Sequence, residues 1–184
     1  MKYRIDEAAE MQPQVQRVNQ KKVRVYFDHH TEEREGTDGK ITIVHIAKFV
    51  EVESQESDAV VLAKIAVQGE ITEYDNSSAV NEFTFNGQKM WLPREMRSML
   101  RDRLELDKSQ SLTTTKLIYE GVVIELPIVT AEAMLTQLEV YARDCFDKTN
   151  EHAANVSQLD NVDNIVNYDY TLGYPPKLVF DLAE

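Results

Sequence analysis

The sequence contains a single cysteine, Cys145, and this scarcity excludes an internal disulfide framework. A lone thiol fits a reducing compartment, where disulfides seldom persist. Glycine and proline are also infrequent, at six and five residues, so the composition argues against wholesale disorder. With 184 residues and 42% hydrophobic side chains, the chain can form the core of one domain or of two small ones.

Long apolar runs are absent as well. No window approaches the roughly 18 uncharged apolar residues of a membrane-spanning helix, and the first residues, MKYRIDEAAEMQPQ, lack the apolar stretch of a signal peptide. The formal net charge of −12 disfavours nonspecific binding to nucleic acid or to an anionic membrane surface. We therefore expect neither nucleic acid nor a membrane among the partners.

Motifs that carry catalysis or nucleotide binding are missing too. The sequence has no P-loop, no G-x-G-x-x-G and no G-x-S-x-G. His29 and His30 lack the spacing of a metal site, and a solvated turn is the preferred interpretation. Cys145 stands near Asp144 and Asp147, and acidic neighbours make a thiol less reactive. We therefore predict no catalytic residues, no metal site and no cofactor.

The most regular stretch is the segment 130–159, in which apolar and small residues recur at steps of three and four. That spacing predicts one long α-helix, capped by Thr130, with a single inward face. A break near 152–155 is an alternative, because the helix is long for this chain. The inward face is predicted to contain Ala131, Met134, Leu135, Leu138, Tyr141, Ala142, Cys145, Phe146, Thr149, His152, Ala153 and Val156.

The residues before this helix alternate between strand and helix patterns, so the predicted fold class is α+β. Residues 1–20 are polar and are expected to form an N-terminal arm, either disordered or docked on a neighbouring subunit. Residues 21–71 are expected to form a small ββα unit, a hairpin of strands 23–28 and 41–52 with a helix from Asp58. The connecting stretch, HHTEEREGTDGK, is expected to be a solvated loop with an Asp38-Gly39 turn.

Residues 72–184 are expected to form an α+β domain of β-hairpins packed on the long helix. Asn86-Gly87 is the strongest hairpin signal, and Glu120-Gly121 marks a second hairpin or a bent strand. The helix after Pro93 is expected to turn Met96, Met99, Leu100 and Leu104 inward. Trp91, just before it, is expected to be buried against the long helix near Leu138 and Tyr141.

The C-terminal segment, YDYTLGYPPKLVF, is rich in aromatic residues and is expected to be an extended tail, because its adjacent prolines exclude a helix. Two arrangements stay open: the tail closes its own core, or it is exchanged between subunits. A strip of arginines on the helix after Pro93 also has two interpretations: internal ion pairing, or docking of an acidic partner or of another copy of this chain. The candidate interface residues are Arg94, Arg97, Arg101, Tyr168, Tyr170 and Tyr174.

Four runs within residues 72–181 form a recognisable pattern: VNEFTFNGQKMWLPREMRSML, TTTKLIYEGVVIELP, AMLTQLEVYARDCFDKTNEHAANVSQL and YDYTLGYPPKL. Its most specific positions are Asn86, Gly87, Trp91, Leu92, Arg97, Leu138, Glu139, Tyr141, Ala142, Cys145, His152 and the run from Tyr168 to Pro175. This pattern resembles a domain family of Bacteroidetes phage and prophage tail-fibre-associated proteins, encoded among tail genes. Pro93 stands where members more often have Asp, and Tyr119 where Trp often precedes the loop.

The resemblance implies no enzymatic activity and assigns no binding residues. It leads us to expect a non-enzymatic virion structural protein of the tail, connector or fibre base, made in the host bacterial cytoplasm. Its expected partners are other phage structural proteins and copies of itself. One alternative is a tail-fibre assembly chaperone that is not retained in the virion, and a weaker one is an adhesin that uses Trp91 and the tail tyrosines.

Overall fold

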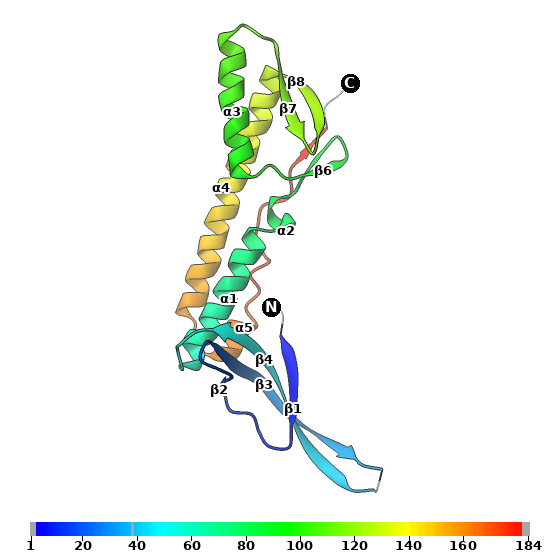
Figure 1. The fold of residues 1–184 in the computed structure, drawn as a ribbon, viewed down its shortest axis with the longest axis vertical. Helices are drawn as coiled ribbons and strands as arrows, with labels where there is room; N and C mark the ends of the chain where they lie inside the picture. Colours follow the sequence, from blue (N-terminus) through cyan, green and yellow to red (C-terminus); the bar gives the residue numbers. More distant parts are fainter. Residues whose placement is uncertain (1–2, 38, 182–184) are drawn as a thin grey trace. The chain divides into compact units, whose positions relative to one another are not determined.

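The computed structural model describes residues 3–37 and 39–181, and it confirms a mixed α+β fold with several strands in small sheets and one long helix (Figure 1). The chain divides into two compact units. Unit 1 takes the residues up to Glu73 together with Glu151–Tyr170, and unit 2 takes Tyr74–Asn150 and the residues from Thr171 onward. The sequence pattern had suggested a boundary at 71–72, with 151–170 in the later domain.

Unit 1 is built on a four-stranded antiparallel sheet in the order β1-β4-β3-β2. Strands β3 (Lys22–Glu35) and β4 (Ile41–Glu53) form its central hairpin, and β1 (Arg4–Ala8) and β2 (Val15–Arg17) are its edges. The segment expected to be a loose arm therefore includes two paired strands. The segment is polar because edge strands are exposed. The strands are held by backbone hydrogen bonds, which the side-chain pattern does not indicate.

The β3–β4 hairpin is also longer than predicted. The ladder continues from Thr31 opposite His45 to Glu35 opposite Ile41, so most of the expected loop is strand. The remaining connection is 36–40, where Gly39 has φ 75°, while the predicted turn partner Asp38 lies outside the described residues. The loop prediction was therefore wrong. Polar side chains had indicated a loop, but an antiparallel two-stranded ribbon can also expose polar side chains to water.

Helix α1 (Ala59–Asp75) begins at the predicted cap, because Asp58 Oδ1 accepts hydrogen bonds from the backbone N–H groups of Val60 and Val61 at 2.8 and 3.0 Å. Its face in unit 1 buries Leu62, Ala63, Val67 and Ile71. Val61 and Ile65 on the same helix are 41% and 39% exposed. Unit 1 also contains the short helix α5 (Val162–Val166), which is capped by Asn161.

Helix α4 (Ile128–Gln158) is one continuous helix of 31 residues, without the alternative break. It starts directly after Pro127, two residues before the expected cap. Phe146, predicted inward, is 61% exposed. Most of the predicted inward face is confirmed by the buried residues Ala131, Met134, Leu135, Leu138, Tyr141, Cys145, His152 and Val156.

Unit 2 contains both predicted hairpins, β5 (Phe83–Phe85) with β6 (Gln88–Met90) and β7 (Thr114–Tyr119) with β8 (Val122–Pro127). The two-residue loops have positive φ throughout, 45° and 78° at Asn86-Gly87 and 47° and 81° at Glu120-Gly121. This backbone is the type I′ turn that matches strand twist, and both hairpin predictions are confirmed. Helices α2 (Ser78–Asn81) and α3 (Arg94–Ser109) complete the unit.

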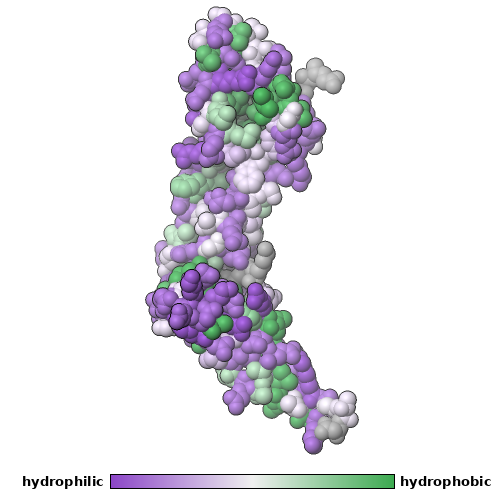
Figure 2. Space-filling model, viewed as in Figure 1, coloured by the Kyte–Doolittle hydropathy of each residue, from purple (hydrophilic) through white to green (hydrophobic). Residues whose placement is uncertain are grey.

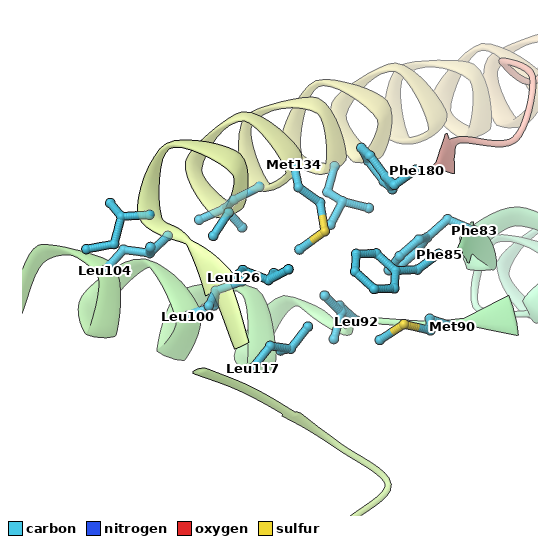
Figure 3. Packing of buried hydrophobic residues seen from close by; sticks show 14 residues of the cluster. Phe83, Phe85, Met90, Leu92, Leu100, Leu104, Leu117, Leu126, Met134 and Phe180 are labelled. Carbon is cyan, nitrogen blue, oxygen red and sulfur yellow. The ribbon is translucent and has the colours of Figure 1, made fainter. Parts of the chain in front are cut away.

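The tail ends in β9 (Val179–Phe180), which pairs in parallel with β5. Phe180 thereby enters the core of unit 2, with its ring edge-on to Phe83 at 5.7 Å between centroids. The core combines residues from the hairpins, α3, α4 and the tail (Figure 3). The labelled members are Phe83, Phe85, Met90, Leu92, Leu100, Leu104, Leu117, Leu126, Met134 and Phe180.

Two expected core residues lie elsewhere. Trp91 is half-buried, while its neighbours Met90 and Leu92 are each 2% exposed. The chain is extended here, so successive side chains point to opposite sides and Trp91 turns away from the core. On α3, Met99 is 71% exposed because Leu100 occupies the inward position. The predictions for Trp91 and Met99 were therefore wrong.

Candidate interaction surface

The predicted arginine strip on α3 is divided by ion pairs within unit 2. Arg97 Nε and Arg101 Nη2 lie 3.3 and 2.8 Å from the same carboxylate oxygen of Glu139 on α4. Arg97 also donates to the backbone oxygen of Leu92 at 2.8 Å, and its side chain is only 13% exposed. Two of the three arginines thus join α3 to α4, and only Arg94 remains exposed without such a pair among the described residues.

Two of the predicted tyrosines are held within unit 1. The Tyr168 hydroxyl lies 2.8 Å from His152 Nδ1 and accepts from Asn155 Nδ2 at 3.2 Å. Tyr170 is buried and donates to Glu70 Oε2 at 3.2 Å. Burial and the nearby carboxylate raise the pKa of Tyr170 to about 12, so its hydroxyl stays protonated. These contacts anchor the start of the tail in its own chain.

Tyr174, the third predicted tyrosine, belongs to unit 2. Its hydroxyl lies 2.9 Å from Thr149 Oγ1, and its ring stands edge-on to Tyr74 at 5.5 Å between centroids. Burial raises the pKa of this hydroxyl as well. The six predicted interface residues are thus divided between the two units, and all but Arg94 make contacts within their own unit.

An apolar groove opens instead between α3 and β7, with a volume of about 130 Å³. Met99 and Ile118 are 71% and 56% exposed in it. Lys116 adds a cation that has no ion pair within the described residues, and Arg103 adds another, 3.7 Å from Asp107. We call this set the α3–β7 groove, and it comprises Met96, Met99, Leu100, Arg103, Lys116, Leu117 and Ile118.

The apolar surface continues from the groove onto β8. Ile118 lies opposite Val123 in the ladder, and both side chains are 56% exposed. Cross-strand partners share one face of a sheet, so these residues extend the groove across the hairpin. Figure 2 shows hydrophobic residues gathered over β7 and β8. Contiguous apolar surface of this kind marks sites of interaction in soluble proteins.

A wider hollow lies between α3 and α4, with a volume of about 440 Å³. Its lining includes Arg101, Glu139, Glu132 and Arg143, which carry both signs of charge. Arg101 pairs with Glu139, Glu132 with Lys108, and Arg143 with Asp144. These four charges are already paired, whereas Glu105, which also lines the hollow, has no ion pair within the described residues.

In unit 1, the outer part of the β3–β4 hairpin, residues 31–35 and 41–43, is exposed on both faces. Ile41 and Ile43 are 67% and 54% exposed and lie opposite Glu35 and Glu33. One face, which we call the Ile–Glu face, therefore presents two isoleucines beside two carboxylates. Neither Glu33 nor Glu35 forms an ion pair within the described part of the chain.

The opposite face of the hairpin is internally compensated. Arg34 donates to both carboxylate oxygens of Glu7 on β1, at 2.8 and 2.9 Å, and to Glu32 at 3.2 Å. The Arg34 guanidinium holds the pKa of the Glu7 carboxyl below its ordinary value. The two faces of the hairpin thus differ, and only the Ile–Glu face carries unpaired acids.

A β-bulge between Phe27 and His30 separates the outer hairpin from the packed sheet. Asp28 adopts φ 53° there, an uncommon backbone for a residue with a side chain, and its carboxylate lies 2.6 Å from Lys48 Nζ. This cation lowers the pKa of Asp28. His29 and His30 lie within β3 at this bulge, so the solvated-turn interpretation was wrong.

The thiol of Cys145 is buried in unit 2 and packs beside Val80 and Tyr141. It is 3% exposed, and burial raises its pKa. A buried thiol with a raised pKa is a poor nucleophile. Its environment is that of a packing residue.

Sequence reasoning missed both exposed surfaces. The sequence signal for the groove was the presence of apolar residues at positions that do not face the core. Met99 lies next to the buried stripe of α3, and Ile118 points to the face of β7 opposite that of buried Leu117. Apolar residues also stand on both faces of β4. Only its inner part is covered, and Ile41 and Ile43 are exposed.

No group of three or more His, Cys, Asp or Glu side chains within residues 3–37 and 39–181 is arranged to hold a metal ion. None of the helices in these ranges is long and apolar enough to cross a membrane. Comparisons with protein-family models, curated proteins and solved structures found no match to this chain. The likeness to phage tail-fibre-associated proteins therefore stays a prediction that rests on the residues quoted above.

Proposed function

We propose that this chain is a non-enzymatic bacteriophage virion structural protein of the tail, connector or fibre base. It is made in the host bacterial cytoplasm, and it acts in a multi-copy assembly through contacts with other phage structural proteins and with copies of itself. The resemblance in the sequence supplies the phage setting, and the surfaces described above support a role in protein–protein contacts.

The observation that carries an interaction role is the exposed apolar surface of the α3–β7 groove. Met99 and Ile118, and Val123 next to the groove on β8, remain exposed although α3, β7 and β8 bury Leu100, Leu117 and Leu126. Leaving such side chains in water costs roughly 25 cal/mol per Å² relative to burial, so a partner that covers them gains that free energy. The flanking cations Arg103 and Lys116 add a preference for acidic partners.

The chemistry of the titratable groups supports a non-enzymatic role. Structural ion pairs and burial also shift pKa values, so a shifted group is not by itself a sign of an active site. Here the shift at Asp28 is explained by Lys48, that at Glu7 by Arg34, and that at Cys145 by burial. Each group has a structural partner or a packed environment that accounts for its state.

The proposal is tested with phage particles purified on a density gradient and probed with an antibody against this chain. Co-sedimentation of the chain with intact particles, resistant to a high-salt wash, is the expected result. A chain confined to the soluble fraction of infected cells would refute the structural role.

The second candidate function is a tail-fibre assembly chaperone, favoured by the same groove and by the net charge of −12, which suits a soluble holder of an apolar fibre segment. Co-expression separates the two functions. A chaperone raises the soluble yield of the fibre protein and is then missing from finished particles, whereas a structural protein is retained in them.

A further inference from the structure

We infer that copies of this chain associate head to tail, with the Ile–Glu face of the β3–β4 hairpin of one copy docked in the α3–β7 groove of the next. This inference rests on the proposed function, since it names one partner of the multi-copy assembly. Each surface is described within its own unit, and the contact joins two separate molecules.

The two surfaces are complementary in composition. The hairpin face offers Ile41 and Ile43, which are 67% and 54% exposed, and the groove offers Met99 and Ile118, which are 71% and 56% exposed. Contact between them removes apolar area from water on both sides.

The charges beside these apolar residues are also complementary. Glu33 and Glu35 flank the isoleucines, since each lies opposite one of them in the ladder. Lys116 and Arg103 flank the groove. Glu33, Glu35 and Lys116 have no ion pair within the described ranges of the chain, and Lys116 lies opposite the carboxylate-bearing Glu125 in the β7–β8 ladder. Arg103 has one long contact, 3.7 Å to Asp107.

The same charges disfavour symmetric pairing. Two grooves facing each other would bring cations together, and two hairpin faces would bring carboxylates together, which costs free energy in both cases. Only the mixed contact pairs opposite signs. Such a heterologous contact uses different surfaces on the two copies, so it forms a closed ring or an open chain of copies according to the rotation between neighbours.

The net charge of −12 opposes close approach of copies, and the contact is therefore expected to be weak for an isolated pair. At about 0.15 M salt the Debye length is about 8 Å, so remote repulsion is screened while charges in direct contact still attract. Sedimentation velocity at this ionic strength is the appropriate measurement, with protein concentrations up to about 1 mM.

Two double variants test the contact, each built on exposed positions. The hairpin variant is Ile41→Thr with Ile43→Thr, and the groove variant is Lys116→Glu with Ile118→Thr. Threonine keeps strand propensity while it removes apolar surface. The matched control is Val129→Thr, at a position on α4 that is 77% exposed and outside both surfaces. Circular dichroism checks that each variant is folded.

We expect the wild type and the control to show a mass that rises with concentration, and each double variant to stay monomeric. An equal mixture of the two variants should form a heterodimer and stop there, because one intact groove meets one intact hairpin. A monomeric wild type overturns the inference, and so does undiminished association of either variant or a mixture without heterodimer. Absence from particles would instead refute the proposed function, which this experiment does not address.

Discussion

The hydroxyl of Tyr168 lies 2.8 Å from Nδ1 of His152, and this contact ties the beginning of the aromatic tail to α4 within unit 1. Tyr168→Phe keeps the ring and removes the hydroxyl. We expect the free energy of unfolding in urea to fall by about 1 kcal/mol, because a hydrogen bond to a 4% exposed imidazole is lost. Asn155→Ala, which removes the exposed second partner, should cost less. Equal stability of Tyr168→Phe and wild type would contradict this role.

The end of the tail is expected to stabilise unit 2 through Phe180. Phe180→Ala removes a ring that is 8% exposed and packs edge-on against Phe83, so the expected loss is about 3–5 kcal/mol. Val179→Ala is the matched control, because Val179 is the neighbour of Phe180 in β9 and its own side chain is 59% exposed. This substitution should change the free energy of unfolding by less than about 0.5 kcal/mol. Similar melting temperatures for the two variants would show that the tail does not close this core.

Trp91 and Leu92 are expected to differ sharply in their contribution to stability. Leu92→Ala should cost about 2–5 kcal/mol, because the side chain is 2% exposed within the core of unit 2. Trp91→Ala should cost about 1 kcal/mol, since this side chain is half-buried and points away from that core. Chemical denaturation of both variants provides the comparison. A larger loss for Trp91→Ala would reverse the assigned orientation.

The ion pair of Asp28 and Lys48 predicts a specific dependence on pH. Lys48 lowers the pKa of Asp28 below its usual 3.8, so the pair stabilises the fold above that value and its contribution is lost as the pH falls through the lowered pKa. Asp28→Asn keeps a residue type that tolerates the positive φ. The wild type should melt higher than Asp28→Asn at pH 7, and the difference should shrink below about pH 4.

The exposed Asp102→Asn, on α3, is the control for this titration, because Asp102 has no ion pair within the described residues. It should shift the melting temperature little at either pH. A difference between Asp28→Asn and wild type that persists unchanged at low pH would show that the carboxylate charge is not the stabilising element.

Cys145 is expected to resist alkylation in the native protein. Burial to 3% exposure and the resulting rise of its pKa keep the thiol protonated and covered. Iodoacetamide at pH 7.5 should label it slowly, and labelling should accelerate in urea at the unfolding transition. Rapid stoichiometric labelling of folded protein would indicate a reactive thiol and would count against a packing role.

Much of the fold follows from local signals. The 3.6-residue period of 130–159 predicts α4, and the loops Asn86-Gly87 and Glu120-Gly121 indicate two hairpins, because each signal depends on the local backbone. The edge strands β1 and β2 lack this kind of signal. Their side chains are mostly exposed, and they are held by backbone pairing with residues distant in the sequence.

The candidate surface was harder to predict than the fold. An arginine strip attracts notice in an acidic sequence, yet Glu139, which pairs with Arg97 and Arg101, lies on a distant helix. Conversely, Met99 and Ile118 have the composition of core residues, and only packing shows that Leu100 and Leu117 occupy the core instead. Partner choice depends on tertiary contacts that no local period encodes.

The most direct test of the account is quantitative mass spectrometry of purified particles of the phage that encodes this chain, with isotope-labelled peptides as standards. The account predicts that peptides from both units are present in particles at several copies, in a fixed ratio to a known tail protein. Peptides that are abundant in infected cells but missing from purified particles would contradict it.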